Sequence, residues 1–385
     1  MINRIKAAQL KLQLLSEGLQ FSNRFLIQFS KDSLYMEKRK VYNNPDEKYD
    51  RGIKKIPQEL LINDIIIAVN FKRRSPWILD YEEAFGYVLK KEDKVITTVT
   101  FPRRPHFLSA HMKNGMECGY VANLYGGMDL AFFTPATCYY NASDSGCLYC
   151  SLKSNRKNGD DYATWITEEM VEEVTGIALD LDRDIVKGVM LVGGNMQNEN
   201  ENFLNLLKLT DAIERIQVSQ MGEVIWETHI ATMPPTDCSL FEFAKSYNLR
   251  ITMNMEVFDD KLFSQYCPGK FTLYGRDKLK NAIKTAAAII DYGKVHSILI
   301  AGLEPVESTI EGIHFLAENG ICPIINVFHN DFGTPLQNHK RPSSDELLKI
   351  GKELQTIYLK YGFVPYWDGC GRNSLDYEAK EALFV

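Results

Sequence analysis

Residues 128–150 read MDLAFFTPATCYYNASDSGCLYC, a short apolar run followed by three closely spaced cysteines. The apolar run, Met128–Thr134, has the length of one buried β-strand. Cys138, Cys147 and Cys150 follow it with the spacing C-x8-C-x2-C. Three thiolates on one loop can bind three irons of an iron–sulfur cube and leave the fourth iron open to a small molecule. The stretch therefore predicts a strand that ends in a cluster-binding loop.

Two other interpretations of these cysteines remain open on spacing alone. A structural zinc site usually takes four ligands from paired C-x2-C or Cys/His sets. Only one such pair is present, and the histidines before it, His106 and His111, lie well upstream. Cysteines that only pack in a core are usually scattered, as Cys238, Cys267 and Cys322 are. The spacing favours cluster binding over zinc binding or burial.

Strand-length apolar runs alternate with helical patterns from residue 128 onward. The runs are Met128–Thr134, Gly188–Val192, Val224–Ile230, Arg250–Met255, Ser297–Ala301 and Pro323–Phe328. The series of β–α units predicts a parallel sheet with helices outside it. Six units suit a partly closed barrel, in which chemistry lies at the carboxyl ends of the strands. The cysteine loop follows the first strand and so lies at that end.

The expected fold class is α/β: a partial (β/α)6 TIM-type barrel with an N-terminal α+β region and a short C-terminal extension. Residues 1–127 combine a helical start, Asn3–Leu19, with short apolar runs separated by charged and proline-containing stretches. We expect this α+β region at 1–127, the barrel at 128–340, and a C-terminal helix and tail at 341–385.

Composition limits the class of protein. The chain has 385 residues, 45% of them apolar, and a formal net charge of −6, which argues against a general nucleic-acid binder. Eight cysteines are too few for a disulfide scaffold in a chain of this length. No stretch approaches the roughly 20 apolar residues that span a bilayer. We expect a cytoplasmic protein without a membrane or nucleic-acid partner.

The chain from about residue 128 to 340 resembles the radical S-adenosylmethionine (radical SAM) enzymes. The resemblance rests on several motifs in order, each after its own strand. They are the cysteine loop with Tyr149 between its last two cysteines, Leu191–Asn195, Asn254–Phe258, Ile298–Glu304, and Asn326–His329 with the turn Gly333-Thr334-Pro335. The last of these looks like the biotin-synthase-like branch. Each motif is weak alone, but the ordered series is hard to obtain by chance.

The resemblance implies roles for individual residues. Tyr149 would contact the adenine of S-adenosylmethionine, and the backbone of Gly193, Gly194 and Asn195 would bind its methionine amino group. The remaining residues that the resemblance assigns to the cofactor are Glu256 at the ribose, Gly302 and Glu304 in the adenine segment, and Phe328 at the end of the sixth strand.

Two departures from the family pattern stand out. The family's commonest cysteine spacing is C-x3-C-x2-C, so the first gap here is five residues longer and is filled with turn-forming residues. Asn195 stands where Glu is usual. A longer loop can still present three thiolates, and much of the family's contact at the second position comes from backbone atoms.

The resemblance also implies a mechanism. An oxygen-sensitive [4Fe–4S] cluster binds S-adenosylmethionine, and one electron from ferredoxin or flavodoxin cleaves it to a 5′-deoxyadenosyl radical. The radical then abstracts hydrogen from a small-molecule or carrier-bound substrate. Strand alternation offers substrate-pocket candidates, which are Glu227, His229, Asn254, Asn326 and His329. For Glu227 and His229, pairing with each other or with neighbours is an equally good explanation.

Two alternatives remain. Sulfur insertion, as in lipoyl or biotin synthases, needs an auxiliary iron–sulfur cluster, for which Cys118 and Cys370 are the candidate ligands. The five cysteines outside the loop form no C-x2-C pair, so a single cluster is the preferred interpretation. The second alternative is a non-catalytic iron–sulfur or zinc protein, in which the Gly-Gly, Glu and Gly-Thr-Pro motifs would have no role.

Overall fold

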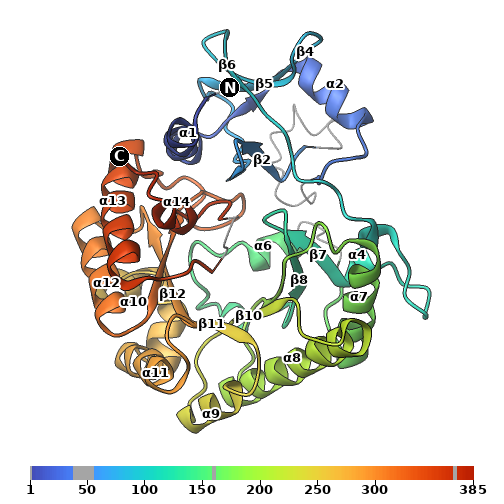
Figure 1. Cartoon of the computed structure of the whole chain (residues 1–385). Coiled ribbons are helices and arrows are strands. Elements are labelled where there is room, and N and C mark those ends of the chain that lie inside the picture. The colour runs from blue at the N-terminus through green and yellow to red at the C-terminus, as the bar shows by residue number, and fades with distance from the viewer. Residues whose placement is uncertain (1, 38–55, 158–161, 367–370) are drawn as a thin grey trace.

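A seven-stranded sheet forms the centre of the molecule (Figure 1). The computed structural model describes residues 2–37, 56–157, 162–366 and 371–385. The sheet order is β13-β12-β11-β10-β9-β8-β7, so each strand lies beside the strand next to it in the sequence. The strands are β7 (Ala122–Tyr125), β8 (Asp129–Phe133), β9 (Gly188–Val192), β10 (Glu227–Ala231), β11 (Leu249–Thr252), β12 (Val295–Ala301) and β13 (Cys322–Val327). Strands β8 to β13 are parallel, which confirms the predicted partial α/β barrel.

Helices cover the outside of this sheet, as Figure 1 shows. They are α7 (Glu168–Leu181), α8 (Glu199–Met221), α9 (Phe241–Ala244), α10 (Asp260–Tyr266), α11 (Arg276–Ile289), α12 (Val306–Glu318) and α13 (Ser344–Tyr361). Side-chain caps begin several of them: Thr167 accepts from the Met170 N–H, and Ser343 forms a capping box with Glu346. All seven residues of β12 are buried, as expected for a strand covered on both faces.

Strand β10 begins later than the apolar run Val224–Ile230 suggests. The backbone N–H groups of Ile225 and Trp226 both donate to Oε1 of Gln217 on α8, at 3.1 and 2.7 Å. These groups therefore bind a helix side chain and do not join the sheet ladder. The strand starts at Glu227, and this places Glu227 at the amino end of the barrel.

The N-terminal region is α+β, as expected. Its helices are α1 (Arg4–Glu17) and α2 (Asn23–Lys31), and a four-stranded sheet has the order β1-β4-β5-β6. The strands are β1 (Gln20–Phe21), β4 (Trp77–Glu82), β5 (Gly86–Lys91) and β6 (Lys94–Thr98), and β2 (Glu59–Ile62) with β3 (Ile65–Ala68) forms a separate hairpin. Rings of Phe25, Phe29, Tyr87 and Phe101 pack edge to face beneath α2.

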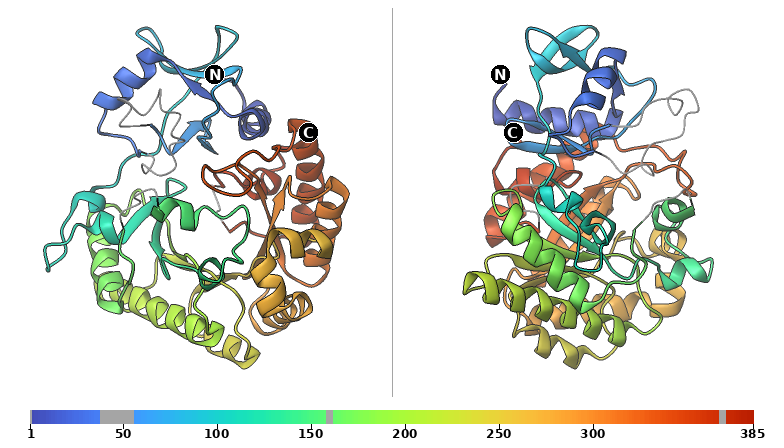
Figure 2. Two further views of the ribbon diagram at one scale, coloured as in Figure 1. Left: turned by 180° about the vertical axis from the view of Figure 1, so that it is seen from behind. Right: turned by 90° about the vertical axis from the view of Figure 1, so that its right-hand side faces the viewer.

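This hairpin region spans the gap between the two edges of the open barrel (Figures 1 and 2). On one side, Gln58 Nε2 donates to the Leu124 carbonyl of β7 at 3.3 Å. On the other side, the Ala68 N–H donates to the Arg372 carbonyl at 2.9 Å, and Ser374 in the same segment bridges to β13. The N-terminal region thus completes the barrel wall that six β–α units leave open.

A buried ion pair joins the first helix to the end of the chain. Lys11 Nζ lies 2.7 Å from Glu378 Oε1 on α14 (Asp376–Lys380), and both side chains are fully buried. Lys11 also donates to the Gly371 carbonyl. Because each buried charge needs its partner, this contact fixes α1 against α14.

Three further α-helices in the described residues are short. The helices are α4 (Cys118–Val121), α5 (Tyr139–Ala142) and α6 (Leu152–Lys157).

Strand β7, which the sequence patterns did not reveal, pairs antiparallel with β8, so the sheet begins before residue 128. The predicted domain boundaries after residues 127 and 340 remain predictions. None of the helices in the described ranges is long and apolar enough to cross a membrane.

Candidate functional site

A cavity of about 380 Å³ opens at the carboxyl ends of the barrel strands. Most of the site residues expected from the sequence line it together, although they come from four different strands or the loops after them. They are Cys138, Cys147, Tyr149, Cys150, Gly193, Gly194, Asn195, Asn254, Glu256, Asn326, Phe328 and His329. The volume lies in the range of small-molecule and cofactor sites.

The cysteine loop is held at both ends by backbone hydrogen bonds. The Tyr139 N–H donates to the Asn195 carbonyl in the loop after β9, at 2.8 Å. The Leu148 N–H donates to the Tyr266 carbonyl at 2.9 Å, and the Gly269 N–H donates to the Ser145 carbonyl at 2.8 Å. The extra residues in the first cysteine gap therefore bind the segment that follows α10.

Gly194 allows two of these loops to touch. Its N–H donates to the Pro135 carbonyl at 2.8 Å. A Cβ atom at Gly194 would lie 2.2 Å from the Thr137 oxygen and 2.6 Å from the Cys138 Cα, both of which are backbone atoms. Gly193 is equally restricted, with a Cβ position 2.4 Å from the Pro135 oxygen. The glycine pair therefore sets the position of Cys138, in addition to any contact with a ligand.

Glu256 forms a buried ion pair in the cavity wall. Its Oε1 lies 2.7 Å from Lys270 Nζ, and the two side chains are 7% and 9% exposed. Glu256 has a φ of 63°, a left-handed backbone conformation that is uncommon for this residue type. Its backbone nevertheless bonds to β12, since its N–H donates to the Ile298 carbonyl at 2.8 Å. Burial opposes the charge of Lys270, but attraction to Glu256 more than offsets this and raises the Lys270 pKa.

Cys267 and Lys270 are site residues that the sequence interpretation missed. Cys267 was expected only to pack, yet its thiol lies beside Cys147 and, with the charge of Lys270, lowers the Cys147 pKa. Burial raises the pKa of Cys150 to about 12. A thiolate ligand is easier to form where donors and cations surround it. The stretch Cys267-Pro268-Gly269-Lys270 was the only signal in the sequence.

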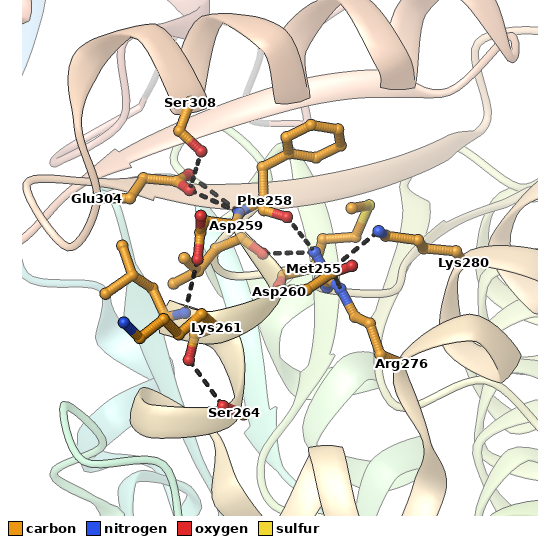
Figure 3. Close-up of polar contacts among 12 residues, drawn as sticks. Met255, Phe258, Asp259, Asp260, Lys261, Ser264, Arg276, Lys280, Glu304 and Ser308 are labelled. Carbon is orange, nitrogen blue, oxygen red and sulfur yellow. Dashed lines mark hydrogen bonds and ion pairs between the residues drawn. The ribbon is translucent and has the colours of Figure 1, made fainter.

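Glu304 supports the site from outside the cavity (Figure 3). Its carboxylate accepts from the backbone N–H groups of Phe258 and Asp259, each at 2.9 Å, and from Ser308 Oγ at 2.8 Å. From the other side, Arg276 donates to the Val257 carbonyl at 2.7 Å and to the Phe258 carbonyl at 2.9 Å. Together they hold the backbone directly after Glu256.

Glu304 and Gly302 do not line the cavity, so their expected direct contact with the cofactor is not seen in its walls. Gly302 has a φ of 101°, and a Cβ atom there would lie 2.6 Å from Pro342 Cδ. Its conformation is therefore required by packing against the segment that leads into α13. Both residues position the strand end and its loop, which carry the residues that do face the cavity.

Glu227 and His229, which the sequence offered as substrate-pocket candidates, are not among the residues that line the cavity. Glu227 is the first residue of β10 and His229 is its middle residue. Glu227 Oε2 is 2.6 Å from Arg250 Nε and 3.6 Å from His229 Nε2, and Lys294 also binds the carboxylate. Burial opposes ionisation of Glu227, but these partners outweigh it and lower the pKa to about 2. The His229 ring packs 4.4 Å from the Tyr366 ring. The alternation of side chains along the strand showed that Glu227 and His229 share one face. It did not show where along the barrel axis that face lies.

The other substrate-pocket candidates line the cavity. Asn326 carries a side-chain oxygen that is buried and, within the described residues, accepts no hydrogen bond. Asn254 Oδ1 accepts from the Ile298 N–H at 3.4 Å, and His329 Nε2 lies 3.4 Å from Asp331 Oδ1. A buried acceptor without a donor costs free energy, so Asn326 favours a cavity that holds a hydrogen-bonding ligand.

Cys118, one of the two candidate ligands for a second cluster, is not among the residues that line the cavity. Cys118 is fully buried at the start of α4, and burial raises its pKa to about 11. Cys370 lies outside the described residues. No group of three or more His, Cys, Asp or Glu side chains in the described ranges is arranged to hold a metal ion.

Comparison with known proteins gives one curated relative. No protein-family model matches the chain. The chain is 25% identical, over 236 residues, to the bacteriochlorophyllide c C-7(1)-hydroxylase of Chlorobaculum limnaeum. The match covers 58% of this chain and 58% of the relative, so it spans less than two thirds of the relative's length.

Several solved structures are also similar to this one. SuiB of Streptococcus suis bound to S-adenosylmethionine has a TM-score of 0.42 and 16% identity over 60% of this chain and 48% of that chain. HydG, a maturase of the [FeFe]-hydrogenase, has a TM-score of 0.47 and 12% identity over 61% and 50%. A radical SAM methyltransferase from Sphaerobacter thermophilus has a TM-score of 0.44 and 13% identity over 70% of each chain.

Proposed function

We propose that this protein is a radical SAM enzyme that abstracts a hydrogen atom from a C–H bond of its substrate. The main support for this proposal is the set of residues that line the cysteine-containing cavity. Residues that are far apart in the sequence line this one cavity together: Cys138, the Gly193–Asn195 loop, Glu256 and Phe328. The curated relative is named a hydroxylase, and hydroxylation of carbon also begins with attack on a C–H bond.

Cys138, Cys147 and Cys150 would hold a [4Fe–4S] cluster on one wall of the cavity. When bound with S-adenosylmethionine and reduced, such a cluster supplies a 5′-deoxyadenosyl radical next to the substrate. The neighbouring Cys267 thiol and the charge of Lys270 favour the thiolate form of Cys147 that a cluster needs. Ferredoxin or flavodoxin is the expected electron donor.

The remaining lining residues would bind and shield the cofactor and substrate. Tyr149 offers a ring for the adenine, and Asn195 and Glu256 border the space beside the cysteine loop. Apolar side chains of Ile298 and Ile300 face the cavity and keep water from a reactive radical. Asn326 provides a buried acceptor for a substrate donor group.

The finer assignment is to the biotin-synthase-like branch, with a small-molecule or carrier-bound substrate. The strand end at Asn326–His329 and the turn Gly333-Thr334-Pro335 support it. We propose a single cluster, because Cys118 packs away from the cavity. Anaerobically purified protein should contain about four irons per chain, whereas sulfur insertion would require about six to eight.

The test is reductive cleavage of S-adenosylmethionine. Anaerobically reconstituted protein with dithionite should form 5′-deoxyadenosine, quantified by liquid chromatography and mass spectrometry. The Cys150→Ala variant, treated identically, is the matched control and should form none. If cluster-loaded protein yields no 5′-deoxyadenosine even with cell extract as a source of substrate, the proposal is wrong and a non-catalytic iron–sulfur protein is the better interpretation.

A further inference from the structure

A second cavity lies between the N-terminal region and the loop that follows β13. Its volume is about 660 Å³. One wall comes from the end of α1 and the 71–73 segment, and the other comes from residues 330–343. Within the first wall, the Leu19 N–H donates to the Asn70 carbonyl and the Lys72 N–H donates to the Leu19 carbonyl, each at 3.0 Å, so the 70–72 segment is fixed beside the end of α1.

Positive charge is concentrated in this cavity, although the whole chain has a net charge of −6. Lys72, Arg73, Lys340 and Arg341 all line it. Glu17 is the one carboxylate among its described lining residues, and its Oε2 already accepts from Trp77 Nε1 at 2.8 Å. Asp331 also lies close enough to Arg341 for its charge to raise the pKa of the guanidinium. Positive side chains nevertheless outnumber the carboxylates at this cavity, and such a surface attracts anions.

Arg341 is the cation best placed to bind a ligand. Its Nε donates to Asn330 Oδ1 at 2.7 Å, so one edge of the guanidinium is fixed. Its Nη1 is buried and has no hydrogen-bond partner within the described residues. Burial lowers the Arg341 pKa to about 10, which still leaves it charged at neutral pH. A buried charged donor without an acceptor is costly unless an acceptor arrives with a ligand.

The surrounding backbone makes room for this arginine. A Cβ atom at Gly18 would lie 3.0 Å from Arg341 Nη1 and 2.8 Å from the Asn70 carbonyl oxygen. Gly18 also has a φ of 68°, in the left-handed region. On the other side, the next residue, Pro342, packs closely against Gly302. The position of the guanidinium is therefore built into the fold, and is not that of a mobile surface side chain.

The second cavity shares a wall with the first. Phe328, His329 and Asp331 line the cavity that contains the cysteines, whereas Asn330 and Phe332 line the basic cavity. Asn330 is also the residue that fixes Arg341. A ligand in the basic cavity would therefore contact the same short segment that borders the proposed cofactor site.

We propose that this basic cavity is a binding site for a small molecule that carries a phosphate or carboxylate group. The anionic group would bind Arg341, with Lys72, Arg73 and Lys340 around it, and the apolar part would lie against Phe332. Guanidinium groups bind phosphates and carboxylates through paired hydrogen bonds, and the resulting bonds are strong. Binding at this site requires neither a cluster nor turnover, so the inference stands apart from the proposed function.

Isothermal titration calorimetry on the full-length protein at fixed ionic strength tests this site. Inorganic pyrophosphate and citrate are titrated separately, so that phosphate and carboxylate ligands are distinguished. Saturable binding of at least one anion is expected. The Arg341→Gln variant should bind it weaker by about tenfold or more, and Arg341→Lys should be intermediate because it keeps the charge but loses the paired donors.

The control variant is Lys284→Gln, which removes the same charge from an exposed position on α11 and should bind like the natural chain. If Arg341→Gln fails to fold, the Lys72→Gln/Lys340→Gln double variant replaces it, because both lysines are exposed. If neither anion shows saturable binding, the proposal is overturned. Equal affinity in the cavity variants and the Lys284→Gln control would overturn it as well.

Discussion

Lys270 Nζ lies 2.7 Å from Glu256 Oε1 in the wall of the cysteine-lined cavity, and both side chains are more than nine-tenths buried. Glu256 follows β11, whereas Lys270 follows α10, so the pair joins two loops. Lys270 is also close enough to Cys147 and Cys267 for its charge to affect the pKa values of both thiols. The ion pair therefore links the segment expected to contact the cofactor ribose to the segment after α10, which in turn bonds to the cysteine loop through the Gly269 N–H and the Ser145 carbonyl.

Removal of Lys270 should destabilise the protein strongly. Lys270→Met keeps the length of the side chain but leaves Glu256 buried without a cation. Breaking a buried pair from one side costs about 3 kcal/mol or more of unfolding free energy. Urea unfolding of the cluster-free protein at neutral pH measures this cost.

The matched control is Lys349→Met, which breaks a pair with Glu307 of the same 2.7 Å length but 57% and 70% exposed. Its cost should stay below about 1 kcal/mol. The Lys270→Met/Glu256→Gln double variant should recover much of the loss, because the buried charge is removed with its partner. Equal losses for the buried and exposed pairs would contradict this account.

Gly194→Ala should disturb the cysteine loop although no cysteine is changed. The new Cβ would lie 2.2 Å from the Thr137 oxygen, so the backbone at Cys138 must move. We expect a loss of about 1–3 kcal/mol in stability and a lower iron content after anaerobic reconstitution.

Gly176→Ala is the corresponding control. Its nearest neighbour would be the Gln220 amide nitrogen at 3.0 Å, the end of a flexible side chain that can move away. A midhelix Gly→Ala change should be neutral or slightly stabilising and should leave the iron content unchanged. Full iron content and unchanged stability in Gly194→Ala would show that the close contact with Cys138 does not matter.

Replacement of Cys138, Cys147 and Cys150 together by alanine should remove the cluster. The expected loss is about four irons per chain, together with the visible absorption of the anaerobic protein. Cys238→Ala is the control, because Cys238 lies outside the cysteine-lined cavity. Retention of iron and colour by the triple variant would place the cluster elsewhere.

Asp129 should make stability depend on pH. It is buried at the start of β8, and burial raises its pKa from 3.8 to about 6. A raised carboxyl pKa means that the folded state favours the protonated form, so the stabilisation present below pH 4 is lost as the pH rises through about 6.

Asp129→Asn stays neutral, so it should gain stability relative to the natural chain between pH 5 and pH 8, by up to about 3 kcal/mol. Urea unfolding at the two pH values measures the gain. Asp180→Asn, at an exposed position on α7, should show no such difference. An Asp129→Asn variant with the same pH dependence as the natural chain would exclude Asp129 as the source.

Local patterns in the sequence were enough to predict the barrel. Apolar runs of strand length and helical periodicity are properties of neighbouring residues, and they identified β8, β9 and β13 to within about one residue. The same patterns placed Cys138, Cys147 and Cys150 after the first barrel strand, and the structure has them in one cavity. Their role as cluster ligands stays a prediction.

Contacts between distant segments were decided only by the tertiary structure. No local pattern shows that Cys267 and Lys270 lie against Cys147, since more than a hundred residues separate them. Strand alternation identified a face for Glu227, but the amide of Gln217 takes the preceding N–H groups and so puts Glu227 at the amino end.

The N-terminal region also makes long-range contacts that local sequence patterns do not predict. Its sequence predicted helices and strands, but not that Gln58 and Ala68 would bond to the two edges of an open barrel. The sequence by itself determined which segments become strands and helices, because those choices depend on residues close along the chain. Which loops meet, and which charges find partners, depends on strand register and on packing between remote segments, and these exist only in the folded protein.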